Sequence, residues 1–140
     1  MADELARNRY GVVIAHDEPS YLELRWLPTT STMADDDFMT GLMMLASEAE
    51  VLASRAILID ATRFSHNFTD FDDTMAWRDR QVIPRYNSAG VQKFAFLMPS
   101  GFGGPTAESG AEPRVDGPTA AFPTQWFIER PNAVAWLMGR

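Results

Sequence analysis

Apolar and polar residues alternate near the start of the chain in a way that predicts a β-hairpin. Residues 10–15 are rich in β-branched side chains, and residues 21–27 alternate, with Leu22 and Leu24 on one face and polar side chains on the other. A period of two is typical of a strand with one buried face. A polar stretch with a proline, residues 16–20, separates the two runs. We therefore expect an antiparallel hairpin with one solvated face.

Later segments have the spacing of amphipathic helices. In residues 35–55, apolar side chains recur at steps of four and three: Phe38, Leu42, Leu45, Ala49 and Leu52. A second helix is expected to begin at residues 69–73 and to end near Pro84, because proline disrupts a helix interior. Aspartates in both first turns complement the helix dipole. A shorter helix is expected over residues 131–138.

Two nearly continuous apolar runs separate these helices. Residues 56–60 and 91–98 are typical of buried parallel strands, and residues 122–128 suggest an edge strand. Strands that alternate with helices favour a mostly parallel sheet with right-handed crossovers. The pattern predicts one α/β domain over residues 1–140, with a four- to five-stranded mixed sheet, an N-terminal hairpin and about four helices.

Residues 100–121 interrupt this pattern. They contain five glycines and three prolines, with almost no large apolar residue after Phe102. A loop of about 20 residues is uncommon in a compact domain and is typical of a lid, a binding loop or a disordered segment. The glycines at 101–104 lack the Gly-Lys-Ser/Thr sequence of a phosphate-binding loop, so we expect a flexible loop or lid.

Composition and charge exclude several classes of function. The chain has 12 Lys and Arg against 19 Asp and Glu, a formal net charge of −7, which disfavours binding to nucleic acid or to an anionic membrane surface. It has no cysteine, which excludes disulfides, thiol nucleophiles and iron–sulfur clusters. It has neither a long apolar run nor a basic leader, so we expect a cytoplasmic protein without integral membrane association.

The order of elements resembles that of a known family. The strand at residues 56–60, the strand at 91–98 and the ending Ala133-Val134-Ala135-Trp136-Leu137 are similar to SpoIIAA-like proteins, whose C-terminus reads Ala-x-Ala-Trp-Leu. The resemblance implies a STAS-like fold, a group that is also compared with lipid-binding Sec14-type domains. The phosphorylatable Asp-Ser-x-Gly turn of the anti-sigma antagonist branch is absent, so a phospho-switch at Ser65 or Thr69 is not implied.

One candidate polar site follows the buried strand at residues 56–60. Arg63, Ser65, His66 and Thr69 lie where the carboxyl edge of a parallel sheet meets a helix start, a place where α/β folds bind anions. In a functional interpretation, Arg63 holds a carboxylate or phosphate and His66 carries a proton. In the simpler interpretation these residues cap the helix or face solvent. With only two histidines, no metal site and no cofactor are expected.

A second candidate site is apolar. Eight Met, nine Phe and four Trp are many for this length, and methionine fills irregular apolar space. Met39, Met43 and Phe102 would line a pocket under residues 100–121, of the kind that a lipid or fatty-acyl ligand needs. The alternative is a methionine-rich core. As a further alternative, the aromatic residues near the expected edge strand, namely Trp126, Phe127 and Trp136, form a self-association surface of a homodimer.

No complete catalytic constellation is present, and the sequence therefore favours a non-enzymatic binding or regulatory module. Such a module would act through an apolar ligand pocket or a protein-contact surface. The alternative is a small enzyme or ligand-handling protein with an anion or proton-transfer site near Arg63 and His66, under the loop at 100–121. A small apolar or anionic ligand is the expected partner in either case.

Overall fold

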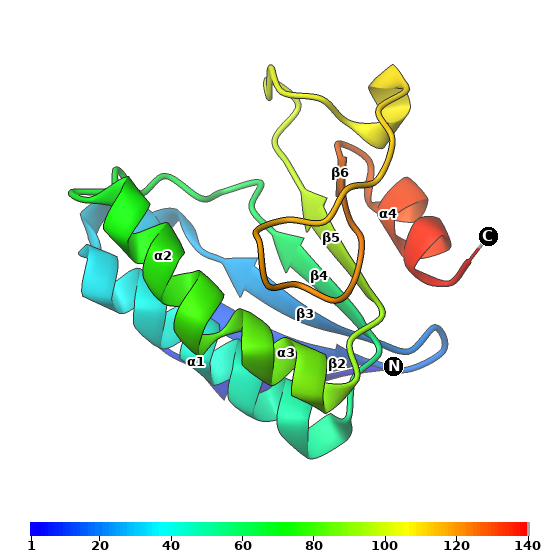
Figure 1. Cartoon of the computed structure of the whole chain (residues 1–140), viewed down its shortest axis with the longest axis horizontal. Coiled ribbons are helices and arrows are strands. Elements are labelled where there is room, and N and C mark those ends of the chain that lie inside the picture. The colour runs from blue at the N-terminus through cyan, green and yellow to red at the C-terminus, as the bar shows by residue number, and fades with distance from the viewer. Residues whose placement is uncertain (140) are drawn as a thin grey trace.

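The computed structural model describes residues 1–139, which form a six-stranded mixed sheet with helices on both faces (Figure 1). The strands lie in the sheet in the order in which they occur in the chain. The first three pair antiparallel and the rest pair parallel, which confirms the α/β class and the mixed sheet. The strands are β1 (Ala2–Arg7), β2 (Gly11–His16), β3 (Tyr21–Trp26), β4 (Ala56–Asp60), β5 (Lys93–Leu97) and β6 (Thr124–Phe127).

Helices cover the two faces unequally. Three of them pack on one face and the fourth packs on the other, over β4, β5 and β6 (Figure 1). The helices are α1 (Asp35–Leu52), α2 (Phe71–Gln81), α3 (Ile83–Ala89) and α4 (Arg130–Leu137), with short 3₁₀ turns at Pro28–Thr32 and Ala107–Ser109. Across residues 1–139, none of these helices combines the length and the apolar character that crossing a bilayer requires.

The sheet has one strand more than predicted. The additional strand, β1, is mostly exposed and carries the polar sequence Ala-Asp-Glu-Leu-Ala-Arg. It pairs with β2 through backbone hydrogen bonds at the edge of the sheet. An edge strand of this kind needs no apolar face, and its sequence therefore has no alternation that reveals it.

The prediction that one face of the hairpin meets solvent was wrong. On that face Tyr21 is 8% exposed and Glu23 is fully buried. The guanidinium of Arg130, at the start of α4, donates to both carboxylate oxygens of Glu23 at 2.9 and 3.0 Å. Alternation shows that the two faces differ in polarity, but a polar face can also be buried when ionic partners satisfy it.

The helix predicted to end near Pro84 is two helices. Its first part, α2, ends at Gln81, and Pro84 lies in the first turn of α3. Proline is tolerated there because a first-turn N–H has no partner within the helix. The new helix turns Ile83 and Tyr86 into the core and ends at Gly90, which has a φ of 95°. Residues 87–89 thus belong to α3, although Asn-Ser-Ala-Gly is a sequence typical of a turn.

Candidate functional site

A partly open cavity of about 650 Å³ lies between the sheet and its cover of α1, α2 and α3. This volume is within the range of pockets that bind small molecules, which is roughly 300–1,000 Å³. Seventeen of its 21 lining residues are apolar, and most of these are aromatic. The residues after β5 contribute Met98, Phe102 and Phe122 to the wall, so the cavity lies under the glycine- and proline-rich loop.

Aromatic rings form one end of the cavity. Trp26 of β3 stacks on Phe38 of α1, with ring centroids 5.5 Å apart, and Phe64 meets Trp26 edge-on at 5.4 Å. Phe68 meets Phe38 edge-on at 4.9 Å. Phe71 opens this end to the surface, because its side chain is 55% exposed. Rings in these arrangements hold one another in place, so this end of the cavity has a stiff wall.

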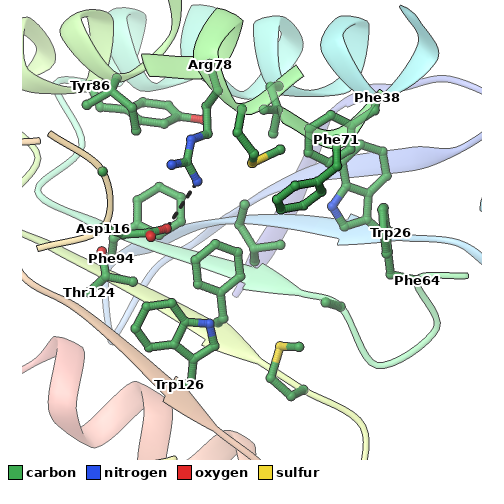
Figure 2. A pocket seen from close by; sticks show the side chains of 18 of the residues that line it. Trp26, Phe38, Phe64, Phe71, Arg78, Tyr86, Phe94, Asp116, Thr124 and Trp126 are labelled. Atoms are coloured by element: carbon green, nitrogen blue, oxygen red, sulfur yellow. Dashed lines mark hydrogen bonds and ion pairs between the residues drawn. The ribbon is translucent and has the colours of Figure 1, made fainter. Parts of the chain in front are cut away.

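The four polar lining residues form the other end, which we call the polar end: Arg78, Tyr86, Asp116 and Thr124. Figure 2 shows them on the opposite side of the cavity from Trp26, Phe38, Phe64 and Phe71. Arg78 donates from Nη1 to Asp116 at 3.1 Å and from Nη2 to Asp79 at 3.0 Å. The cation of the polar end is therefore shared between two carboxylates.

Two hydroxyls at the polar end are buried without a partner. The Tyr86 hydroxyl and Thr124 Oγ1 are the only buried side-chain oxygen or nitrogen atoms in residues 1–139 that lack a hydrogen bond. Burial raises the pKa of the Tyr86 hydroxyl above its usual range, so this group is neutral and protonated at pH 7. Buried polar groups are almost always hydrogen-bonded, and two exceptions in one cavity wall require an explanation.

The loop is attached to the domain at two places, one near the start of α4 and one over α2 and α3. Near α4, Glu108 accepts hydrogen bonds from the backbone amides of Ile128 and Glu129, each at 3.1 Å. Over α2 and α3, the Thr119 hydroxyl donates to the Asp79 carbonyl at 3.0 Å, and the Asn87 side chain donates to the Thr119 carbonyl at 2.8 Å. Residues 114–122 thus cross the sheet in front of β5 (Figure 1).

The structure brings only one of the predicted site residues into this cavity. Phe102 lines it, whereas Met39 and Met43 do not belong to its described wall. On α1 the cavity side is taken by Phe38 and Leu42, and the methionines lie one position further around the helix. Met43 is 38% exposed, and its sulfur accepts from Arg85 at 3.4 Å.

Three of the four predicted polar residues, Ser65, His66 and Thr69, lie near one another outside this cavity. His66 Nε2 lies 2.8 Å from Asp35 Oδ1, and the side chain of His66 is 2% exposed. The same carboxylate accepts from the backbone amide of Thr69 at 3.1 Å, and the amide of Ser65 donates to Thr30 Oγ1 at 2.9 Å. These contacts fasten the loop after β4 to the start of α1.

Arg63 lines a separate, smaller hollow of about 300 Å³ at the end of β3 and β4. Its other polar lining residues are Arg25, Asp60 and Thr62. Thr62 donates from its backbone amide and its hydroxyl to Asp60 Oδ1, at 3.0 and 2.6 Å. The anion and proton-transfer site near Arg63 and His66 stays a prediction.

The aromatic residues that suggested a homodimer make contacts within the chain. Trp126 stacks on Phe96, with centroids 5.6 Å apart, and the Arg114 guanidinium lies 4.2 Å from the Trp126 ring centroid. Phe127 is 2% exposed, and Trp136 packs against it with centroids 5.8 Å apart. The homodimer therefore stays a prediction.

The composition of the cavity wall is suited to binding. Among its described lining residues, only Arg78 and Asp116 are charged, and they are paired with each other. The remaining wall offers apolar contact and the two hydroxyls.

Comparisons of the chain with protein-family models, curated proteins and solved structures gave no significant match.

Sequence reasoning missed most of the cavity wall, although one signal was present. Phe64, Phe68 and Phe71 occur within a stretch that is otherwise polar. Large apolar residues in a predicted loop indicate that the loop packs against something. The hydroxyls of Tyr86 and Thr124 had no comparable signal, because their role depends on which elements meet in space.

Proposed function

We propose that this protein is a non-enzymatic binding module that holds a small apolar molecule in the cavity between the sheet and α1, α2 and α3. The observation that carries the proposal is the cavity of about 650 Å³, which is lined mainly by aromatic side chains and crossed by a loop. Apolar surface that leaves water contributes about 25 cal/mol per Å², so such a wall favours apolar ligands in general.

We also propose that the fold is STAS-like and specifically SpoIIAA-like. Support comes from the order of elements: an antiparallel hairpin, then parallel strands β3 to β6 in sequence order, with the Ala-Val-Ala-Trp-Leu segment on α4. The fold alone does not imply a ligand, because one fold carries many functions. The function rests on the cavity.

The experiment fills the cavity with a side chain. Ala61 lines the cavity just after β4, and its replacement in Ala61→Trp occupies space that a ligand would need. We expect wild-type protein to bind pyrene with a saturable change in fluorescence, and Ala61→Trp to bind it at least tenfold more weakly. The matched control is Ala76→Trp, which places the same ring on an exposed position of α2.

Two results would count against the proposal. The first is the absence of saturable binding of pyrene, and of any related apolar compound, to wild-type protein. The second is binding of pyrene to Ala61→Trp and Ala76→Trp as tight as to wild type, which would place the binding site elsewhere. Circular dichroism of both variants shows whether the domain is folded, so that a loss of binding is not confused with unfolding.

A further inference from the structure

We infer that the ligand is an uncharged, flat aromatic molecule with one hydroxyl or carbonyl oxygen, and that this oxygen lies at the polar end of the cavity. The inference rests on the proposed function and adds the chemical class and the orientation of the ligand. It is carried by the position of the two buried hydroxyls, by the charges around them and by the aromatic rings at the opposite end.

The unpaired hydroxyls of Tyr86 and Thr124 can form hydrogen bonds with a ligand oxygen. Phe94 is a neighbour of both residues, because its ring lies 5.4 Å from that of Tyr86 and its Cα is paired with that of Thr124 across β5 and β6. A hydroxyl can donate one hydrogen bond and accept others. A ligand carbonyl can therefore accept from one of these groups, and a ligand hydroxyl can donate to it or accept from it.

The charges at the polar end disfavour an ionised ligand. Arg78 is already shared between Asp79 and Asp116, so one cation faces two carboxylates. A ligand carboxylate would add a further anion and would lose its hydration in an apolar cavity. An ammonium group would also lose its hydration, and both carboxylates already have Arg78 as their partner.

The opposite end favours a flat ring over a flexible chain. Trp26, Phe38 and Phe64 line this end, and each ring packs against the other two. A ligand ring can stack on these surfaces or meet them edge-on. An alkyl chain gains less from such a stiff wall, because each ordered bond of the chain costs conformational entropy.

Binding in this orientation involves the loop. Figure 2 shows the Arg78–Asp116 ion pair between the side chains of Tyr86 and Thr124. Both hydroxyl oxygens are covered, so a ligand oxygen reaches them only when neighbouring side chains move. Because Asp116 is one of these neighbours, we expect binding at the polar end to shift residues 114–122.

The experiment compares probes that share one ring system. Pyrene, pyrenemethanol, pyrene carboxylate and pyrenemethylammonium are titrated by fluorescence, and dodecanol is tested by displacement of pyrenemethanol. We expect pyrenemethanol to bind about three- to tenfold more tightly than pyrene, the value of one net hydrogen bond. The two charged compounds and dodecanol should all bind more weakly than pyrenemethanol.

Two variants test the orientation. Tyr86→Phe and Thr124→Val keep the shape of each side chain and remove its hydroxyl. We expect each to weaken pyrenemethanol binding by about three- to tenfold, and so to reduce the advantage of pyrenemethanol over pyrene measured in the same variant. The midpoint of urea unfolding should stay the same or rise, because a buried hydroxyl without a partner is lost. The matched control is Tyr10→Phe, outside the described cavity wall.

The outcomes separate the inference from the proposed function. Equal binding of pyrene and pyrenemethanol, unaffected by both variants, would overturn the inference and leave the binding module intact. Tightest binding of the carboxylate, the ammonium compound or dodecanol would overturn the inference in the same way. A large loss of stability in Tyr86→Phe would show that this hydroxyl has a partner within the protein, which also overturns it. Failure of every probe would instead contradict the proposed function.

Discussion

At the scale of single residues, the contact between Gly41 and Trp26 sets the distance between α1 and the sheet. A Cβ at position 41 would overlap the six-membered ring of Trp26, which is 2% exposed. The glycine therefore lets the helix lie directly on the indole. Because Trp26 also lines the cavity, the same contact fixes the shape of the aromatic end.

We predict that Gly41→Ala lowers the free energy of unfolding by about 1–3 kcal/mol, the usual cost of overpacking a core. The displaced indole should also weaken pyrene binding. Urea unfolding at equilibrium measures the first effect. Gly103→Ala is the control, since a Cβ at Gly103 would meet nothing within 4 Å. Equal free energies of unfolding for the two variants would contradict the prediction, because they would mean that the Trp26 indole moves aside without loss of stability.

Residue identity alone predicted one part of the cavity wall and missed the rest. Phe102 was a candidate because it is a large apolar residue within a glycine-rich loop, and it does line the cavity. Met39 and Met43 share a helix with true lining residues, but a step of one residue turns a side chain by about 100° around the axis. Spacing within a helix shows which residues share a face, and packing decides what that face meets.

At the scale of elements, the loop over the cavity is held by the Arg78–Asp116 ion pair. Arg78 and Asp116 are 16% and 27% exposed at their side chains, so this pair is only partly screened by solvent. Gly117 next to it has a φ of 89° and lies so close to Arg78 and Asp79 that a Cβ would crowd them. Residues 114–122 thus approach α2 closely.

We predict that Asp116→Asn loosens residues 114–122. The variant should accelerate proteolytic cleavage in this segment by about two- to tenfold, because a partly exposed charged hydrogen bond is lost. Mass spectrometry of the fragments locates the cuts. Glu112→Gln makes the same change of charge at an exposed position of the same loop and serves as control. Identical cleavage of both variants would show that the ion pair does not hold the loop.

Elements with a strong apolar pattern were predictable and the others were not. The run at residues 56–60 matches β4, because a strand buried on both faces is mostly apolar. The edge strand β1 was not predicted from the sequence pattern, because its pairing with β2 uses only backbone hydrogen bonds. The start of α3 was missed because proline permits a first turn as readily as it ends a helix.

At the scale of the whole molecule, an ionic cluster around the buried Glu23 joins distant parts of the chain on the face opposite the cavity. Arg130 of α4 donates to Glu23 of β3 and, at 2.8 Å, to Asp60 of β4. His16 Nε2 lies 2.7 Å from Glu23 Oε1, and Arg25 donates to Glu23 Oε2 at 2.9 Å. Burial alone would raise the pKa of the Glu23 carboxyl, but Arg130 and Arg25 hold this pKa below its usual value.

We predict that this cluster makes stability depend on acid pH. Because the pKa of Glu23 is lower in the folded protein, its stabilising effect is complete above the unfolded value of about 4.3 and is lost as the pH falls through the folded pKa. Glu23→Gln should cost about 3 kcal/mol at neutral pH, since it leaves Arg130 less compensated. It should also flatten the acid limb of the stability profile.

Urea unfolding between pH 7 and pH 3 measures both effects. Glu48→Gln, at a half-buried position of α1, is the control for the change of charge. An unchanged acid limb in Glu23→Gln would show that other carboxylates dominate the acid response. A neutral-pH loss equal to that of the control would show that the cluster contributes little to the fold.

The most direct test of the whole account is the position of a bound aromatic alcohol, measured by nuclear Overhauser effects between pyrenemethanol and the protein. We expect the ring protons to contact the side chains of Trp26 and Phe68, and the hydroxymethyl protons to contact Tyr86 and Thr124. Contacts confined to the outer surface would contradict the binding module. Contacts in the cavity with the hydroxymethyl group beside Trp26 would contradict the orientation.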